Sequence, residues 1–169
     1  MNKADIELLI DYNYWANKLI AEQAARLTAE QLTEPQPPGF SPGSFKKTLA
    51  HTMSAEWIWR MRCQHGISPT ALLNEAEFAD LPAVLARWAE EEQRMREFVS
   101  GVTDEQLAQV MDYKNTSGEP YKKIRGHCLT HLVFHGMQHR SECAVLLTNY
   151  GVSPGNIDLI YYLIEKGMH

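Results

Sequence analysis

The sequence lacks the features that mark several large classes of protein. Basic residues are not in excess, since 16 Lys and Arg stand against 21 Asp and Glu, for a formal net charge of -5. Nucleic-acid-binding proteins usually carry a basic patch or stripe, so this balance argues against a nucleic-acid partner. No apolar run approaches the roughly 20 residues that span a bilayer, and the first residues, Met1 to Lys3, lead into charged sequence rather than a signal peptide. We therefore expect a cytoplasmic protein with no membrane partner.

Cysteine is also scarce. The chain has three, Cys63, Cys128 and Cys143, which form no CxxC pair and are odd in number. They are expected to be reduced thiols rather than parts of a disulfide framework. With 169 residues, 44% of them hydrophobic, the chain is long enough for one domain, residues 1–169, that folds around its own core.

Several motifs of well-known enzymes are missing as well. The sequence contains no Glu-x-x-His, which a di-iron carboxylate bundle needs on two helices, and no His-Glu-x-x-His of metalloproteases. The Gly-x-Ser-x-Gly turn of serine hydrolases, the phosphate-binding P-loop and Gly-x-Gly-x-x-Gly are absent too. These absences favour a mononuclear metal site or none.

The hydrophobic pattern predicts four long amphipathic helices, at residues 5–27, 44–64, 80–101 and 124–150. Capping boxes that begin at Thr28 and Thr103 predict short extra helices, and residues 157–166 predict a terminal one. Residues 35–43 contain four prolines and are expected to form a loop, long enough to be a rim or a lid.

Residues 110–121 read as two short extended arms around Asn115–Gly118, which predicts a small hairpin. The fold class is therefore all-α, a four-helix bundle with a small hairpin excursion between the third and fourth helices. Up-down-up-down order is the default expectation, and the long connections also permit a crossover.

Four of the seven histidines recur at intervals of four residues, as His127, His131, His135 and His139. In an α-helix a step of four residues turns the side chain by about 40° and rises about 6 Å, so neighbours in this series can share one ion. The outer pair is about 120° and 18 Å apart and cannot. His135 and His139 lie within the apolar stripe of this helix. His131 lies at its edge, as a hydrogen-bonding neighbour or a ligand, and His127 lies further out. The stripe comprises Ile124, Cys128, Leu132, Cys143, Leu146 and Tyr150.

A pair of histidines rarely makes a complete site, so a third ligand must come from another element. His51 shares a face of the second predicted helix with Ala55 and Ile58, and an interior imidazole needs a polar partner. Three imidazoles would leave open coordination positions, as catalytic metals require. The spacing alone leaves the other interpretation open, in which His51 is a hydrogen-bonded core residue and the helical pair falls together by chance.

Three segments together resemble the DinB family, also described as DinB/YfiT-like metalloenzymes. They are Asp-Tyr-Asn-Tyr-Trp-Ala-Asn at 11–17, Thr-Leu-Ala-His at 48–51 followed by Glu-Trp at 56–57, and His-Leu-Val-Phe-His-Gly-Met-Gln-His-Arg at 131–140. The hairpin at 113–118 and the segment at 151–162 fit the same family in the same order, so the resemblance covers nearly the whole chain.

The resemblance implies a four-helix bundle, commonly a homodimer, with metal ligands at His51, His135 and His139, the same three residues that the helical faces favour. It also implies a divalent transition metal. Imidazole suits several such metals, so we expect zinc or nickel first, with iron or manganese as alternatives.

The sequence departs from the family at one place. The family usually continues His-Arg-Gly-Gln after the last ligand, whereas this chain has His139, Arg140, Ser141 and Glu142. The carboxylate of Glu142 could be a fourth ligand, a catalytic proton acceptor or an anchor for an imidazole. Arg140 points away from the ligand face, which favours an interhelical salt bridge.

The resemblance implies two chemistries on a small-molecule substrate. One is the activation of a low-molecular-weight thiol for transfer to an electrophile, as in a thiol S-transferase, and the other is hydrolysis by metal-activated water. We place thiol transfer ahead of hydrolysis. The alternative is a non-catalytic metal-binding or stress-response bundle that forms a dimer, in which large side chains and a fourth protein ligand would close the site.

Overall fold

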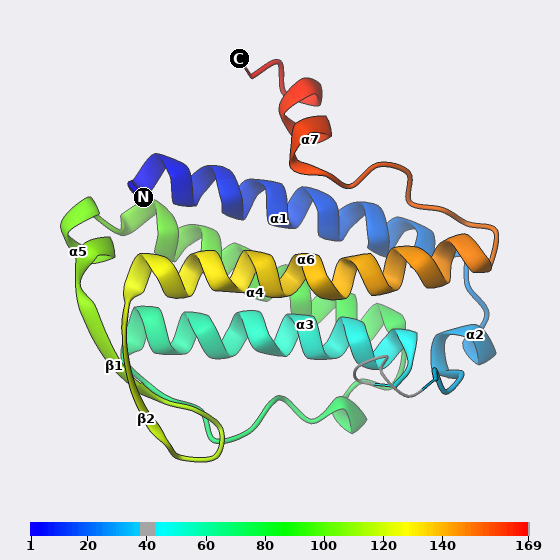
Figure 1. Cartoon of the computed structure of the whole chain (residues 1–169). Helices are drawn as coiled ribbons and strands as arrows, with labels where there is room; N and C mark the ends of the chain where they lie inside the picture. Colours follow the sequence, from blue (N-terminus) through cyan, green and yellow to red (C-terminus); the bar gives the residue numbers. More distant parts are fainter. Residues whose placement is uncertain (38–42, 169) are drawn as a thin grey trace.

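The computed structural model describes residues 1–37 and 43–168. Within them, four long helices make up the bundle: α1 (Lys3–Ala24), α3 (Phe45–Arg60), α4 (Leu81–Gly101) and α6 (Arg125–Asn149). The shorter elements are α2 (Ala29–Thr33), the π-helical turn η1 (Met61–His65), the 3-10 turn η2 (Glu75–Glu77), α5 (Asp104–Ala108), β1 (Val110–Lys114), β2 (Pro120–Ile124) and α7 (Leu159–Glu165). The predicted all-α four-helix bundle with a hairpin before its last long helix is confirmed (Figure 1).

Local capping chemistry explains where these helices begin. The side chain of Ser44 accepts a hydrogen bond from the backbone N–H of Lys47, and Asp80 accepts one from Ala83, so each satisfies a donor that the first turn leaves free. Thr28 and Thr103 form the predicted capping boxes at the starts of α2 and α5. The predicted loop at 35–43 follows α2, and its residues 38–42 lie outside the described part of the chain.

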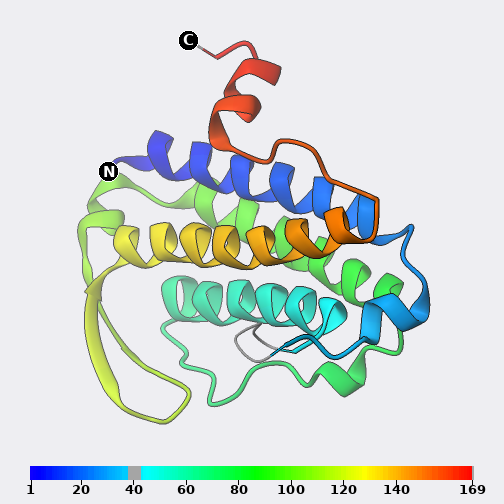
Figure 2. The same ribbon diagram turned by 45° about the vertical axis from the view of Figure 1, so that its right-hand side comes forward.

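The order of the long helices is up-down-down-up, so the default expectation of alternating directions is wrong and the crossover alternative holds. α3 runs parallel to its neighbour α4, and α1 runs parallel to its neighbour α6 (Figures 1 and 2). α6 runs antiparallel to α3, with which it packs directly. α1 and α3 lie diagonally opposite, as do α4 and α6. The connection from α1 to α3 and the connection from α4 to α6 therefore each cross an end of the bundle.

A polar network lies at the centre of the apolar core. Glu56 on α3, only 1% exposed, accepts hydrogen bonds from the side-chain amides of Asn13 (2.9 Å) and Asn17 (3.1 Å) on α1 and from the indole of Trp88 (2.7 Å) on α4. Arg140 on α6 donates to the oxygens of the same two amides. The expected interhelical contact of Arg140 is therefore present, but its partners are amide oxygens rather than a carboxylate.

Gly136 allows this contact between α1 and α6. A Cβ atom at this position would lie 2.9 Å from both the Arg140 guanidinium and the Asn13 side-chain oxygen. That separation is shorter than van der Waals contact, so any side chain here would push α6 away from α1 or break the network.

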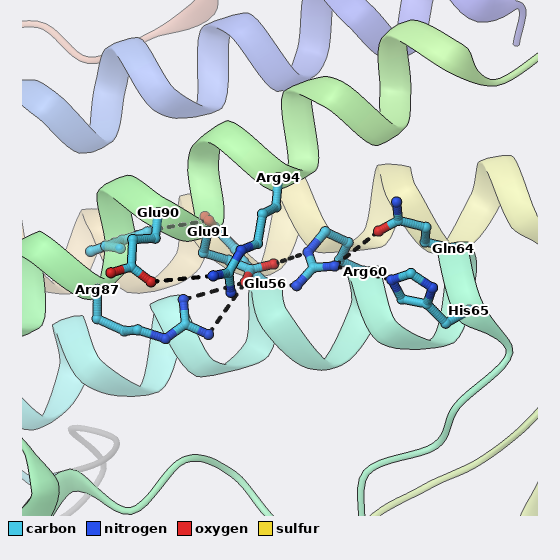
Figure 3. A network of polar contacts seen from close by, with 9 residues as sticks. Glu56, Arg60, Gln64, His65, Arg87, Glu90, Glu91 and Arg94 are labelled. Atoms are coloured by element: carbon cyan, nitrogen blue, oxygen red, sulfur yellow. Dashed lines mark hydrogen bonds and ion pairs between the residues drawn. The ribbon is translucent and has the colours of Figure 1, made fainter.

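A buried ion pair joins α3 to α4. Arg60 bonds to both carboxylate oxygens of Glu91, which is fully buried, and Arg87 approaches the same carboxylate at 3.5 Å (Figure 3). Gln64 accepts a hydrogen bond from Arg60 at 2.9 Å. Two parallel helices are thus held together at a fixed offset by a charge pair that solvent does not reach.

The predicted hairpin pairs β1 with β2 in antiparallel register, with Tyr113 opposite Tyr121. Its turn is closed by a hydrogen bond from the Gly118 backbone to Asn115, and Gly118 has φ +87°, a conformation that glycine adopts readily. Among the described residues, no helix is both long and apolar enough to cross a membrane.

Four large aromatic and methionine side chains of α3 and η1 have different environments. Met53 is wholly buried in the core, and Trp59 packs against Tyr113 of the hairpin, whereas Trp57 and Met61 are half-buried. Met53 and Trp59 are therefore engaged within the monomer, and the homodimer stays a prediction.

We predict that Glu91→Gln lowers the free energy of unfolding by about 3–5 kcal/mol, because it leaves the buried charge of Arg60 without its partner. Urea unfolding followed by circular dichroism measures the change. The matched control is Glu90→Gln, the neighbouring residue, whose ion pair with Arg94 is exposed; its effect should stay within about 0.5 kcal/mol. Equal effects of the two substitutions would contradict this account of the α3–α4 contact.

Candidate metal centre

Three of the seven histidines meet on the seam between α3 and α6. These helices run antiparallel, so His51 on α3 lies opposite the two successive turns of α6 that carry His135 and His139. The ring of His51 is 5.3 Å from that of His135 and 4.8 Å from that of His139, and the rings of His135 and His139 are 4.6 Å apart, measured between centroids. The structure thus brings together the three residues that the sequence predicts as ligands.

The spacing of the imidazole nitrogens fits one metal ion. One ring nitrogen from each residue can be chosen so that all three lie within 4.8 Å of one another, and the Nε2 atoms of His51 and His135 are 3.4 Å apart. Two nitrogens bound to one tetrahedral zinc at about 2.05 Å each would be about 3.3 Å apart. Among residues 1–37 and 43–168, no carboxylate or thiol joins this group, so it offers three protein ligands and leaves coordination positions open.

The electrostatic environment keeps the group ready to bind a cation. Burial, followed by the nearness of His139, lowers the pKa of His51 below its usual value. Burial and the three neighbouring imidazoles lower the pKa of His135 to about 4. Both rings are therefore neutral at pH 7, the state in which an imidazole nitrogen binds a metal ion.

Glu142 contacts one of the three predicted ligands. Its carboxylate lies 2.8 Å from Nδ1 of His139, one turn earlier on α6. A neutral His139 that donates its Nδ1 proton to this carboxylate presents Nε2 without a proton. Of the roles that the sequence left open for Glu142, the geometry favours the anchor, because the carboxylate is not part of the group of potential ligands.

The other histidines within residues 1–37 and 43–168 do not belong to this group. His131 packs edge-on against Trp59, with ring centroids 5.2 Å apart, and lies 5.8 Å from His135. It is therefore a neighbour of one predicted ligand, as expected of a residue at the edge of the apolar stripe. His127 and His65 are exposed.

Two features of this region escaped the sequence pattern. Glu56 enters the family resemblance only as part of the Glu-Trp pair at 56–57, with no role assigned, although its buried carboxylate joins α3 to α1 and α4. Arg62 packs against Trp59 and Tyr113, two residues that are 54 positions apart in the chain. Trp59 is one helical turn before Arg62, but Tyr113 and the partners of Glu56 are distant in sequence, so no helical period could have indicated those contacts.

Comparisons with known proteins agree with the fold. The sequence model of the DinB family matches residues 1–167. Among solved structures, the chain is similar to YfiT from Bacillus subtilis, described as a probable metal-dependent hydrolase with an unusual four-helix bundle topology. The TM-score is 0.65 at 16% sequence identity, and the match covers 90% of this chain and 91% of that one. A comparison with curated proteins finds no match.

We predict that Glu142→Gln weakens zinc binding about 10- to 100-fold, because His139 loses the carboxylate that orients it and makes it more basic. Competition with a chromophoric chelator measures the affinity. The control is Glu97→Gln on α4, an exposed carboxylate that contacts only Gln93 of its own helix, and it should bind zinc as the unmodified protein does. Equal affinities for all three proteins would remove Glu142 from the site.

Proposed function

The chain belongs to the DinB family, and on that premise we propose that it is a metal-dependent enzyme whose three-histidine group holds one divalent ion. The observation that carries the proposal is the meeting of three imidazoles from two helices within 4.8 Å, with no fourth protein ligand among the described residues. Structural metal sites usually have four protein ligands, whereas catalytic ones keep a position for water or substrate. Zinc or nickel is the ion we expect first.

An ion held in this way lowers the pKa of a coordinated water to about 7, or deprotonates a coordinated thiol. The chain's own residues prepare the site for it. His51, His135 and His139 would supply nitrogen donors, and the Glu142 carboxylate, 2.8 Å from Nδ1 of His139, would orient that ring. The substrate would then be a small molecule that reaches the open coordination positions.

Hydrolysis is the reaction that we place first, ahead of thiol transfer. The reason is the likeness in fold to YfiT, which is itself described as a probable metal-dependent hydrolase. Thiol transfer, which we placed first from the sequence, becomes the second candidate, and it rests on what the family resemblance implies.

Thiol transfer would require a thiol from outside the protein. Cys63, Cys128 and Cys143 are all buried, and burial raises the pKa of each, that of Cys63 to about 12. A buried, protonated thiol is a poor nucleophile. The nucleophile would therefore be a low-molecular-weight thiol that binds at the metal.

We predict that zinc raises the melting temperature of the protein and that His135→Ala abolishes this increase. A ligand that binds only the folded state, at a concentration of a hundred times its Kd, adds about 2.7 kcal/mol to the free energy of unfolding. Differential scanning fluorimetry with and without zinc measures the shift. His127→Ala, two turns earlier on the exposed side of α6, should keep the full response. A zinc response that survives in His135→Ala would overturn the ligand assignment.

The reaction can be assigned with two assays on zinc- and nickel-loaded protein. One follows the hydrolysis of activated esters and amides, and the other follows conjugation of a small thiol with an electrophile. In whichever of the two assays detects activity, His51→Ala should lower the rate by about 100-fold or more, because the loss of a ligand removes the activating ion. The exposed His65→Ala is the control. Stoichiometric metal without either activity would favour the alternative, a non-catalytic metal-binding or stress-response dimer.

A further inference from the structure

Arg62 is a buried cation without a polar partner. It is 6% exposed, and its Nε atom is sealed from solvent with no hydrogen bond. Across residues 1–37 and 43–168, no carboxylate or carbonyl oxygen accepts a hydrogen bond from its guanidinium. The two terminal nitrogens are not sealed, so they reach the surface of the protein. Burying an unpaired charge is costly, which makes such a residue a candidate for binding something that the chain itself does not supply.

The other deeply buried arginines are treated differently. Arg60 bonds to both oxygens of Glu91. Arg140 donates from one terminal nitrogen to two amide oxygens, while its Nε and its other terminal nitrogen have no hydrogen-bond partner among the described residues. Both arginines therefore have oxygen acceptors within the described part of the chain, which Arg62 does not. Arg62 rests instead against the rings of Trp59 and Tyr113, with its guanidinium carbon 4.7 and 5.0 Å from their centroids. Cation–π contacts orient a guanidinium but leave its hydrogen-bond donors free.

The surroundings of Arg62 are positive, although the chain carries a net charge of -5. Burial raises the pKa of Cys63 and Cys128, and three cations act against that increase: Arg62 on both thiols, Arg125 on Cys63 and Lys123 on Cys128. Among the described residues, the charged side chains that shift these two pKa values include no carboxylate. The local field therefore favours an anion over a second cation.

Arg62 also lies along the seam that contains the three histidines. The Trp59 ring, which Arg62 contacts, packs against His131, and His131 packs against His135. Trp59 is eight residues after His51 on the same helix, which corresponds to about 12 Å along the axis. Arg62 belongs to the π-helical turn η1, and such turns are frequent at functional sites.

We propose that Arg62 anchors an anionic group, a carboxylate or a phosphate, of the molecule on which the three-histidine site acts. The planar guanidinium can offer two parallel N–H donors to either group, and two aromatic rings already hold it in place. The substrate would then be an elongated anion, with its reacting atoms at the histidines and its charged end at Arg62. This inference rests on the proposed function for the identity of the reacting end, but the anion site can be tested without it.

The first experiment uses the metal-free protein with inorganic phosphate as the probe. In ¹H–¹⁵N NMR spectra, phosphate should produce saturable shifts of the Arg62 side-chain and Trp59 indole signals. Those indole shifts should be absent in Arg62→Met and weaker in Arg62→Lys, which keeps the charge but loses the planar fork. Arg94→Met is the control, because it removes the same charge from an exposed ion pair on α4, and it should respond as the unmodified protein does.

The second experiment uses zinc-loaded protein and a series of ω-mercaptoalkanoic acids of increasing chain length, each compared with the alkanethiol of the same length. The thiol binds the metal, so the difference between the two series isolates the carboxylate. We expect the carboxylate to tighten binding at least tenfold at one intermediate chain length, and Arg62→Met to abolish this advantage. The melting temperature of Arg62→Met should not fall, because the lost cation had no acceptor in the fold.

The outcomes separate the two proposals. Phosphate binding that depends on Arg62 in a protein that binds no metal would support the anion site and contradict the proposed function. Metal binding without any advantage for carboxylates, and without phosphate shifts, would overturn the anion site and leave the proposed function standing. A lower melting temperature for Arg62→Met together with an unchanged response to phosphate would show that Arg62 only supports packing, and would also overturn the inference.

Discussion

The buried carboxylate of Glu56 is the constraint on which the rest of the structure depends. Burial raises the pKa of Glu56, and hydrogen bonds from Trp88, Asn13 and Asn17 oppose this rise. The two asparagine side chains donate to Glu56 and accept from Arg140, so they link an acid and a base that are both removed from water. Separating these helices would leave the Glu56 carboxylate and the two amides without partners in the core, which is costly. The network therefore favours the observed arrangement of the four long helices.

That arrangement determines where the candidate metal centre lies. Arg140 directly follows His139 on α6, and Glu56 lies five residues after His51 on α3, so the network that holds these helices in register also sets His51 opposite His139. The polar core faces the inside of the bundle, and the histidines lie along its seam. Rigid helices on both sides hold the three imidazoles at their spacing, as a metal site with few ligands requires. Further along the same seam, Arg62 carries the charge that we assign to substrate recognition.

Much of the fold could be predicted because its causes are local. Ser44, Asp80 and Thr103 begin helices through hydrogen bonds that span three residues, and these contacts can be recognised from spacing alone. The order of the helices could not be predicted in the same way. Four amphipathic helices can bury their apolar faces in several arrangements, and long connections exclude none of them. Contacts such as that of Arg60 with Glu91 decide the arrangement. They join residues on different helices, which no helical repeat in the sequence relates to each other.

By itself, the sequence determined the helices, the hairpin and the three histidines of the candidate site. The interval of four residues places His135 and His139 on one face of a helix, because the helical repeat is a property of the backbone. Only the tertiary structure decided that His51 meets them and that the Glu142 carboxylate contacts His139 without joining the group of three histidines. It also decided that Arg62 is buried without an acceptor among the described residues. These facts depend on distances between different helices. Such distances arise from the packing of whole helix faces, so they cannot be predicted from any single segment.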